Sequence, residues 1–215
     1  MEAQTWVEVA NSLVAIADGT ALASSASIGV ISPNSSTNPP ITFDANTLFP
    51  GAAIRVTAAG RFSNTGTPTL NLGLYWNGSG GTALATTGAI TTTSGVTNVP
   101  WRVEALIVCR AIGSSGTLFT EGWAHGISGT VGVSVVPMPA SAPTAVTVST
   151  VAAASLDLTA TWGTSSASNT ITCHQFLVEA LNFNPVCSVP GRARRGPHGP
   201  GIRRGRGGTS VAVVA

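Results

Sequence analysis

Apolar and polar residues alternate with a period of two along much of this chain. In residues 54–62 most apolar side chains fall at every second position, between arginines and a threonine. Residues 70–77 repeat the pattern with leucines and a tryptophan. This period is typical of a β-strand with one face in a core and the other in water. The intervening residues 64–68 contain a glycine and a proline, so we expect the two strands to form a hairpin.

Further strands follow from similar patterns, separated by residues that favour turns. The predicted strands are Trp6–Ala17, Trp101–Ile112, Leu118–His125, Gly129–Val136, Ala145–Thr150, Leu156–Gly163 and Thr170–Leu181, with shorter ones at Ile28–Ile31, Ile41–Phe43 and Ala83–Ala89. Part of the first, Glu8–Ala17, also has approximate helical spacing and can be interpreted as a short helix. The number and spacing of strands predict an all-β, antiparallel β-sandwich of jelly-roll type.

Two of these segments, Thr170–Leu181 and Trp101–Ile112, carry apolar residues on both faces. A strand of a two-layered sandwich has one wet face, so a second dry face needs either a covering loop or a neighbouring subunit. We favour the subunit interface. Its predicted residues are Phe176, Val178, Ala180, Leu106 and Val108.

The composition limits the classes of protein that fit this pattern. Charged residues make up 8% of the 215 residues and lysine is absent, whereas an ordinary soluble domain carries about 25% charged residues. Coiled coils and charged helical repeats are therefore excluded, because they need Glu, Lys and Arg on their outer faces. Thr, Ser, Asn and Gly supply the polar surface instead.

Three cysteines do not match the even, dense set of a disulfide-stapled secreted domain, so we expect assembly in a reducing cytoplasm. Residues 1–4 lack the basic and apolar regions of a signal peptide, and no apolar run reaches the roughly 18 residues of a membrane span. We therefore expect no membrane association.

Charge divides the chain into two parts. Residues 1–183 hold all eight acidic residues and four arginines, for a formal charge of −4, and we assign them to the sandwich domain. Residues 184–215 carry a formal charge of +6 without one acidic residue, and form an irregular C-terminal extension rich in Arg, Gly and Pro. Its candidate partner-binding residues are Arg192, Arg194, Arg195, Arg203, Arg204 and Arg206. The partner is an acidic protein surface or nucleic acid; no aromatic residue interleaves these arginines to stack on bases, and we favour protein.

No arrangement of residues predicts catalysis, a metal site or a cofactor. The three histidines lie in separate segments, without ligand spacing to other histidines, cysteines or acids. Asp157 and Glu179 are the best carboxylate pair for glycan hydrolysis, and we interpret them as structural partners of Arg102 or Arg110.

Aromatic side chains can stack on sugars where they are exposed, and the candidates are Trp6, Tyr75, Trp76, Trp101 and Trp123. Of these we expect Tyr75 at the surface. Trp76 and Trp162 lie in phase with leucines, which predicts that both are in the core.

Residues 155–181 read SLDLTATWGTSSASNTITCHQFLVEAL, which resembles a recurrent ending of structural proteins of tailed bacteriophages, where an LDLT…WGTAS…NTIT…F…E pattern closes a β-sandwich. Residues 51–61 and 66–72 resemble an R…AAGR.S…TGTPTL…L pattern of the same proteins. The resemblance covers the middle and end of residues 50–182 and leaves 184–215 outside. It implies a trimeric jelly-roll protein of the virion.

Our first hypothesis is a homotrimeric decoration protein on the capsid surface of a tailed-phage head, bound to the major capsid protein. The alternative is a tail-tip or receptor-binding module of the same fold that recognises host-surface glycans, and a glycan-degrading enzyme is the third. The short stretch before the first strand favours the head over the tip of a fibre.

Overall fold

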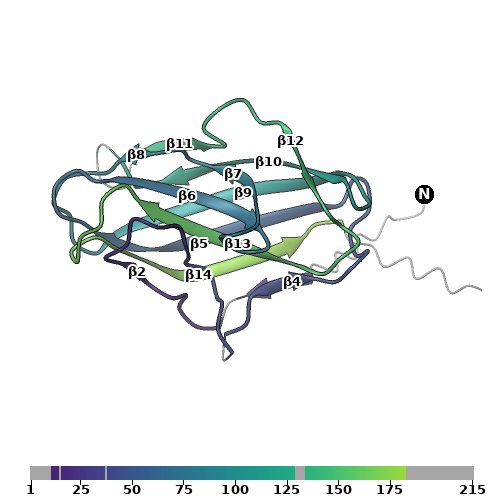
Figure 1. Cartoon of the computed structure of the whole chain (residues 1–215), viewed down its shortest axis with the longest axis horizontal. Helices are drawn as coiled ribbons and strands as arrows, with labels where there is room; N and C mark the ends of the chain where they lie inside the picture. The colour runs from purple at the N-terminus through teal and green to yellow at the C-terminus, as the bar shows by residue number, and fades with distance from the viewer. Residues whose placement is uncertain (1–10, 15, 37, 129–133, 183–215) are drawn as a thin grey trace, which may run out of the picture. The chain divides into compact units, whose positions relative to one another are not determined.

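The computed structural model describes residues 11–14, 16–36, 38–128 and 134–182, which form a sandwich of two antiparallel sheets (Figure 1). Within these residues the larger sheet has eight strands: β1 (Asn11–Val14), β2 (Leu22–Ala23), β5 (Ala53–Ser63), β9 (Val99–Ala111), β10 (Gly116–His125), β11 (Val135–Met138), β12 (Ala145–Val148) and β14 (Thr170–Ala180). The smaller sheet of the described chain has six: β3 (Gly29–Val30), β4 (Ile41–Phe43), β6 (Thr69–Trp76), β7 (Thr82–Thr86), β8 (Ile90–Thr91) and β13 (Ala154–Trp162). The described residues contain no helix, and the predicted all-β sandwich is confirmed. The described residues also include no helix that is long and apolar enough to cross a membrane.

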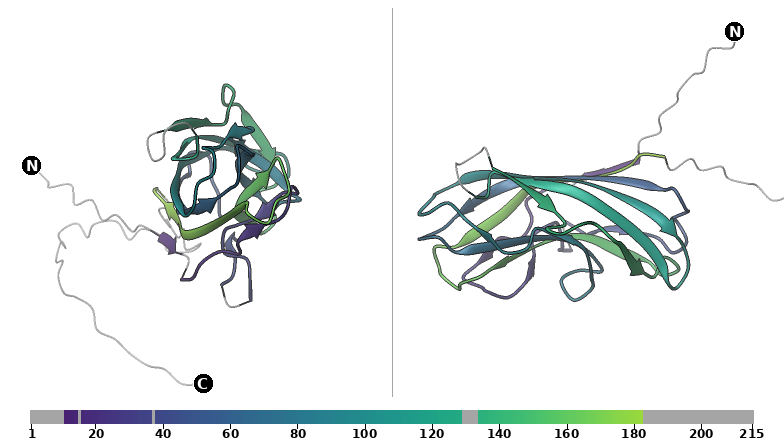
Figure 2. Two further views of the ribbon diagram at one scale, coloured as in Figure 1. Left: turned by 90° about the vertical axis from the view of Figure 1, so that its left-hand side faces the viewer. Right: turned by 90° about the horizontal axis from the view of Figure 1, so that it is seen from above.

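Strands far apart in the sequence pair in a nested order. β1 and β2 pair with β14, β3 and β4 with β13, β5 with β9, and β6 with β7 and β8. The chain is thus one long hairpin folded over itself, in which successive pairs alternate between the two sheets. This nesting is the jelly-roll arrangement. It places β14, β5, β9 and β10 side by side in the larger sheet (Figure 2).

The core lies between the sheets and is filled by the inward residues of each alternating strand. Trp162 and Phe62, from opposite sheets, pack with their ring centroids 6.4 Å apart, and Phe43 stacks on Trp76 at 5.6 Å. Trp76 and Trp162 are both buried, as their phase with the leucines predicted. Each fully buried large apolar side chain stabilises the fold by roughly 1.5–3 kcal/mol relative to exposure.

The expected hairpin between residues 54–62 and 70–77 is wrong. The strands are consecutive, but β5 belongs to the larger sheet and β6 to the smaller one. The connection is held by buried Asn64, whose Nδ2 donates to Thr92 Oγ1 (2.6 Å) and whose Oδ1 accepts from Val96 N (3.0 Å). A turn that contains glycine and proline can connect two strands of one sheet or strands of two different sheets. Turn residues alone therefore do not distinguish a hairpin from a connection between sheets.

A β-bulge in β14 changes the interpretation of its two apolar faces. Cys173 lies opposite Gly60 and Gln175 opposite Ala59, so His174 is an extra residue in the register. The extra residue shifts the alternation, and the apolar side chains on both sides of it point inward. Three predicted interface residues therefore lie buried in the core of a single subunit: Phe176, Val178 and Ala180. Their burial there accounts for their apolar character without a second copy.

The last strands of the larger sheet differ from the prediction in position. The strand expected at Gly129–Val136 is observed as β11, Val135–Met138, and residues 129–133 lie outside the described residues. Pro137 is compatible with a strand here because β11 lies at the edge of the sheet, where a missing N–H costs no ladder bond. In the first predicted segment, the described residues 11–14 form a strand and not a helix.

Asn182, the last described residue, attaches the end of β14 to the sheet. Asn182 Oδ1 accepts from Ala53 N (2.8 Å) and its Nδ2 donates to the Gly51 carbonyl (2.7 Å). The end of β14 is thereby attached to the start of β5. The Arg-rich extension and its six candidate residues lie outside the described residues.

Candidate functional site

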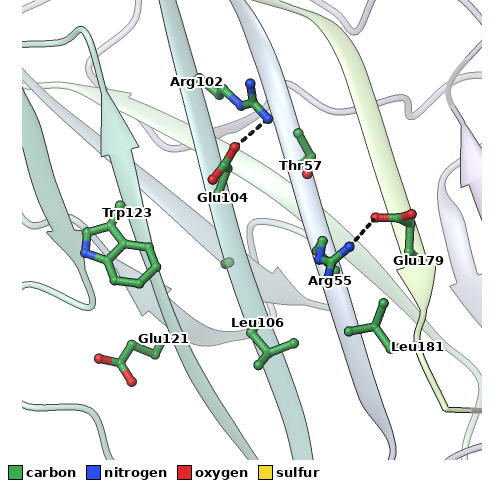
Figure 3. A pocket seen from close by; sticks show the side chains of 10 residues that line it. Arg55, Thr57, Arg102, Glu104, Leu106, Glu121, Trp123, Glu179 and Leu181 are labelled. Atoms are coloured by element: carbon green, nitrogen blue, oxygen red, sulfur yellow. Dashed lines mark ion pairs between the residues drawn. The ribbon is translucent and has the colours of Figure 1, made fainter. Parts of the chain in front are cut away.

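The outer face of the larger sheet is hollowed where β10, β9, β5 and β14 lie side by side (Figure 3). The residues that line the depression are Arg55, Thr57, Arg102, Glu104, Ala105, Leu106, Glu121, Trp123, Glu179 and Leu181. Its volume of about 620 Å³ lies within the roughly 300–1,000 Å³ of sites that bind small molecules. The strand register sets its layout, because Glu104 lies directly between Trp123 and Thr57.

Two ion pairs lie in the lining of the depression. Arg102 pairs with Glu104 on the same strand, and Arg55 Nη1 lies 3.5 Å from Glu179 Oε2 on the neighbouring strand. Glu121 has no ion-pair partner within the described part of the chain. The lining thus combines two arginines with three glutamates, for a formal charge of −1. Exposed ion pairs contribute only about 0–1 kcal/mol, so these groups can exchange partners with a ligand at small cost.

Trp123 forms one side of the depression, and the Arg55–Glu179 pair lies on the other (Figure 3). Trp123 is 48% exposed, although tryptophan is usually well buried. Gly122, the preceding residue, faces inward against β9, where a Cβ would lie 2.3 Å from the Glu104 carbonyl oxygen. Only glycine allows the two strands to approach this closely, which holds Trp123 directly opposite Glu104.

Tyr75, the aromatic residue expected at the surface, lies elsewhere. Tyr75 is half-buried on the outer face of the smaller sheet, where its Cε2 would lie 2.7 Å from a Cβ at Gly73, so its ring covers that glycine. The signal for Trp123 was present, because this residue alternates in phase with Glu121 and His125. An aromatic side chain in phase with charged residues indicates the wet face of a strand.

Of the five predicted interface residues, Leu106 and Val108 lie on the outer face of β9. Leu106 is 42% exposed and lines the depression, whereas Val108 is half-buried and lies nearer the β9–β10 turn. At the adjacent position of β10, Phe119 is covered by Arg110, whose guanidinium carbon lies 3.6 Å from the ring centroid. Arg110 thus packs on an aromatic ring and not on Asp157 or Glu179 as expected.

One end of the sandwich carries exposed apolar side chains on three loops, which we call the apolar end: Phe49 (36% exposed), Ile112 (52%) and Val151 (46%). Backbone hydrogen bonds join the loops, from Gly51 N to the Cys109 carbonyl (2.7 Å), and from Thr150 N to the Gly113 carbonyl (3.0 Å). Asn182, the last described residue, also lies at this end, because its side chain is bonded to Gly51.

The structure separates the carboxylates considered for glycan hydrolysis. Asp157 is buried in the smaller sheet, where it accepts hydrogen bonds from Gly78 N (2.9 Å) and from the hydroxyls of Ser155 and Ser32. Glu179 lies on the outer face of the larger sheet with Arg55. Both have structural partners, but these are not the Arg102 or Arg110 expected from the sequence.

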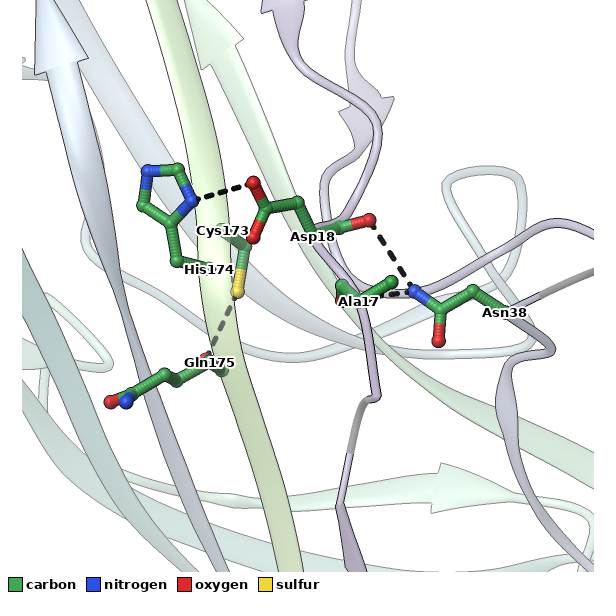
Figure 4. Close-up of polar contacts among 6 residues, drawn as sticks. All are labelled: Ala17, Asp18, Asn38, Cys173, His174 and Gln175. Atoms are coloured by element: carbon green, nitrogen blue, oxygen red, sulfur yellow. Dashed lines mark hydrogen bonds and ion pairs between the residues drawn. The ribbon is translucent and has the colours of Figure 1, made fainter.

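Histidine and cysteine side chains occupy structural positions in the described residues. His174 Nδ1 lies 3.0 Å from Asp18 Oδ2, and Asn38 Nδ2 donates to the Ala17 carbonyl (3.0 Å), so the segment after β1 is attached to β14 (Figure 4). Burial raises the pKa of the Cys173 thiol to about 12 and also raises that of Cys109. Within the described part of the chain, no group of three or more His, Cys, Asp or Glu side chains is arranged to hold a metal ion.

No protein-family model and no curated protein sequence matches the chain. Similar solved structures include the VP2 subviral particle of infectious bursal disease virus, with 11% identity and a TM-score of 0.29 over 81% of this chain, and the Gt strain of that virus, with 16% identity and a TM-score of 0.23 over 84%. The chain spans 34% and 42% of the length of those chains. TM-scores this low do not indicate a function for this chain.

Proposed function

We propose that this chain is a structural protein of a tailed-phage virion, a homotrimeric decoration protein on the outer surface of the head that binds the lattice of the major capsid protein. The observation that carries the proposal is the apolar end, where Phe49, Ile112 and Val151 are exposed and where the last described residue, Asn182, is bonded to Gly51. In the sequence the strongly basic residues 184–215 follow, and apolar contacts together with basic charge suit a protein that attaches to an acidic surface.

The resemblance to phage structural proteins supports this assignment. The matching residues 51–61, 66–72 and 155–181 fall on β5, β6, β13 and β14, which are adjacent central strands of the two sheets. The shared motifs therefore specify the jelly-roll frame, and the loops of the apolar end and the extension are the parts left to determine the partner.

A protein that acts by binding fits the geometry better than an enzyme. Asp157 and Glu179 lie on different sheets, and each is neutralised or hydrogen-bonded by structural partners. The extension also favours a protein partner over nucleic acid, because residues 184–215 contain no Trp, Tyr or Phe to stack on bases.

The proposal is tested by locating the chain in cryo-EM maps of virions assembled with and without its gene. We expect trimeric density on the outside of the head that is lost when the gene is deleted, while the major capsid lattice remains. Density at the tail tip, or particles that lack the protein altogether, would overturn the assignment.

A further inference from the structure

The depression around Trp123 carries the chemistry of a sugar-binding site, and this assignment does not depend on where the protein lies in a virion. We propose that it binds a neutral oligosaccharide, with one pyranose ring stacked on the Trp123 indole. Trp123 lies opposite Glu104, which is eight residues before Ile112 of the apolar end, or roughly 26 Å at strand spacing.

The stacking surface is Trp123. A pyranose ring presents an apolar C–H face, and a half-exposed indole held in a strand offers the flat complementary surface at low cost in conformational entropy. The backbone of β10 is fixed on one side by β9 and on the other by β11, where Pro137 lies opposite Trp123. The backbone that carries the ring is therefore in place before any ligand arrives.

The polar groups match sugar hydroxyls. Glu104 and Glu121 supply carboxylates beside Trp123, on the opposite strand and two residues earlier on the same strand, while Arg102 supplies guanidinium N–H donors. Carboxylates accept two hydrogen bonds and guanidinium donates two in a fixed plane, which suits pairs of neighbouring hydroxyls. The Thr57 hydroxyl and the Arg55–Glu179 pair lie across the depression, in reach of a second sugar.

The charge of the lining selects among sugars. Three glutamates against two arginines give a formal charge of −1. An anionic glycan would be repelled and would leave a carboxylate facing its own, whereas a neutral hexose or N-acetylhexosamine has no such cost. The ligand class is therefore neutral.

The experiment titrates the full-length protein with maltotriose, cellotriose, mannotriose and tri-N-acetylchitotriose, and with sialyllactose as the anionic comparison, by calorimetry and saturation-transfer NMR. We expect saturable binding of at least one neutral trisaccharide and weaker binding of sialyllactose. Trp123→Thr, which keeps a good strand former, should bind about tenfold or more weakly, Trp123→Phe should retain part of the affinity, and Tyr75→Ala should bind as the wild type.

Other results would overturn the proposal. Absence of binding of every neutral probe at millimolar concentration, or unchanged affinity in a folded Trp123→Thr protein, excludes a sugar site here. If Trp123→Thr instead dissociates the oligomer in sedimentation, the depression is a contact between copies of the chain and not a ligand site. Circular dichroism and the unfolding midpoint establish that each variant is folded.

Discussion

At the scale of single residues, Asp157 is a buried carboxylate whose role is to complete the hydrogen bonds of a turn. It accepts from Gly78 N, in the turn after β6, and from two serine hydroxyls. Asp157→Ala should lower the free energy of unfolding by about 3 kcal/mol, because it removes the acceptor of a backbone N–H and of two serine hydroxyls. Asp157→Asn keeps one acceptor oxygen and should cost less.

Urea unfolding of the two Asp157 variants measures this effect, with exposed Asp44→Ala as the control. Equal unfolding midpoints for Asp157→Ala and the control would contradict the structural role. Hydrolysis of a wall polysaccharide by the wild type that is lost in Asp157→Asn would favour the enzyme hypothesis instead.

Cys173 gives a pH dependence at the same scale. Burial raises its pKa from 9.0 to about 12, so between these values the unfolded state releases a proton that the folded state keeps. The contribution to stability is complete below pH 9 and is lost as pH rises toward 12. We expect the unfolding free energy of the wild type to fall more steeply above pH 9 than that of Cys173→Ala, measured in a Cys187→Ser background. Parallel curves would show that this thiol titrates normally.

At the scale of the element, β14 depends on one extra residue. His174 sits in the bulge, and the apolar residues after it reach the core only because of the register shift. Deleting His174 removes the extra residue and should leave Phe176 and Val178 facing the core, so this variant should fold. Deleting Leu177 keeps the bulge but turns Val178 and Ala180 to the outer face, so it should prevent folding. Solubility and near-UV circular dichroism distinguish the two, and a folded Leu177 deletion or an unfolded His174 deletion would contradict this role of the bulge.

The same strand shows what the sequence could and could not predict. The sequence pattern located β5, β6, β9, β10, β13 and β14. In residues 170–181 both faces are apolar, so the sequence is equally compatible with a bulge in one subunit and with a straight strand at an interface. Long-range pairing makes that choice, and no local pattern reports it.

The candidate site was predictable in part. Leu106 was predicted as a subunit-interface residue and lies exposed on the outer face of β9, and Trp123 could have been found from its phase with Glu121. The depression itself could not, because it arises where residues from 55 to 181 in the sequence come together on one sheet. Neighbours across strands depend on the register, which strand periodicity leaves open.

At the scale of the whole molecule, the apolar end and the core respond differently to an added charge. Val178 is buried, so Val178→Arg should unfold the subunit, since an unpaired buried charge costs several kcal/mol. Ile112 is exposed at the apolar end, so Ile112→Arg should leave the subunit folded and weaken its binding to heads. Circular dichroism reports folding, and cosedimentation with heads that lack the protein measures binding, with exposed Thr42→Arg as the control. A folded Val178→Arg protein, or head binding unaffected by Ile112→Arg, would contradict these roles.

The last prediction concerns the extension, which carries six arginines and no carboxylate. One exposed Arg–carboxylate contact contributes only about 0.2–1 kcal/mol, so no single arginine should matter much. Repeated in each subunit of a trimer, these contacts add through effective concentration and can decide whether the protein stays on the particle. Their sum must also weaken as salt screens the charges.

Truncation after Asn182 tests this argument, because it keeps the side chain that bonds Gly51 and Ala53 and removes every arginine of the extension. We expect a folded trimer that binds heads more weakly, with a loss that matches the effect of raised salt on the intact protein. Binding is measured by cosedimentation with heads that lack the protein, and nucleic-acid binding by gel shift at physiological salt. If truncation leaves head binding unchanged and abolishes a steeply salt-dependent shift of DNA or RNA, the extension contacts nucleic acid and not the capsid, because released counterions make phosphate contacts so salt-sensitive.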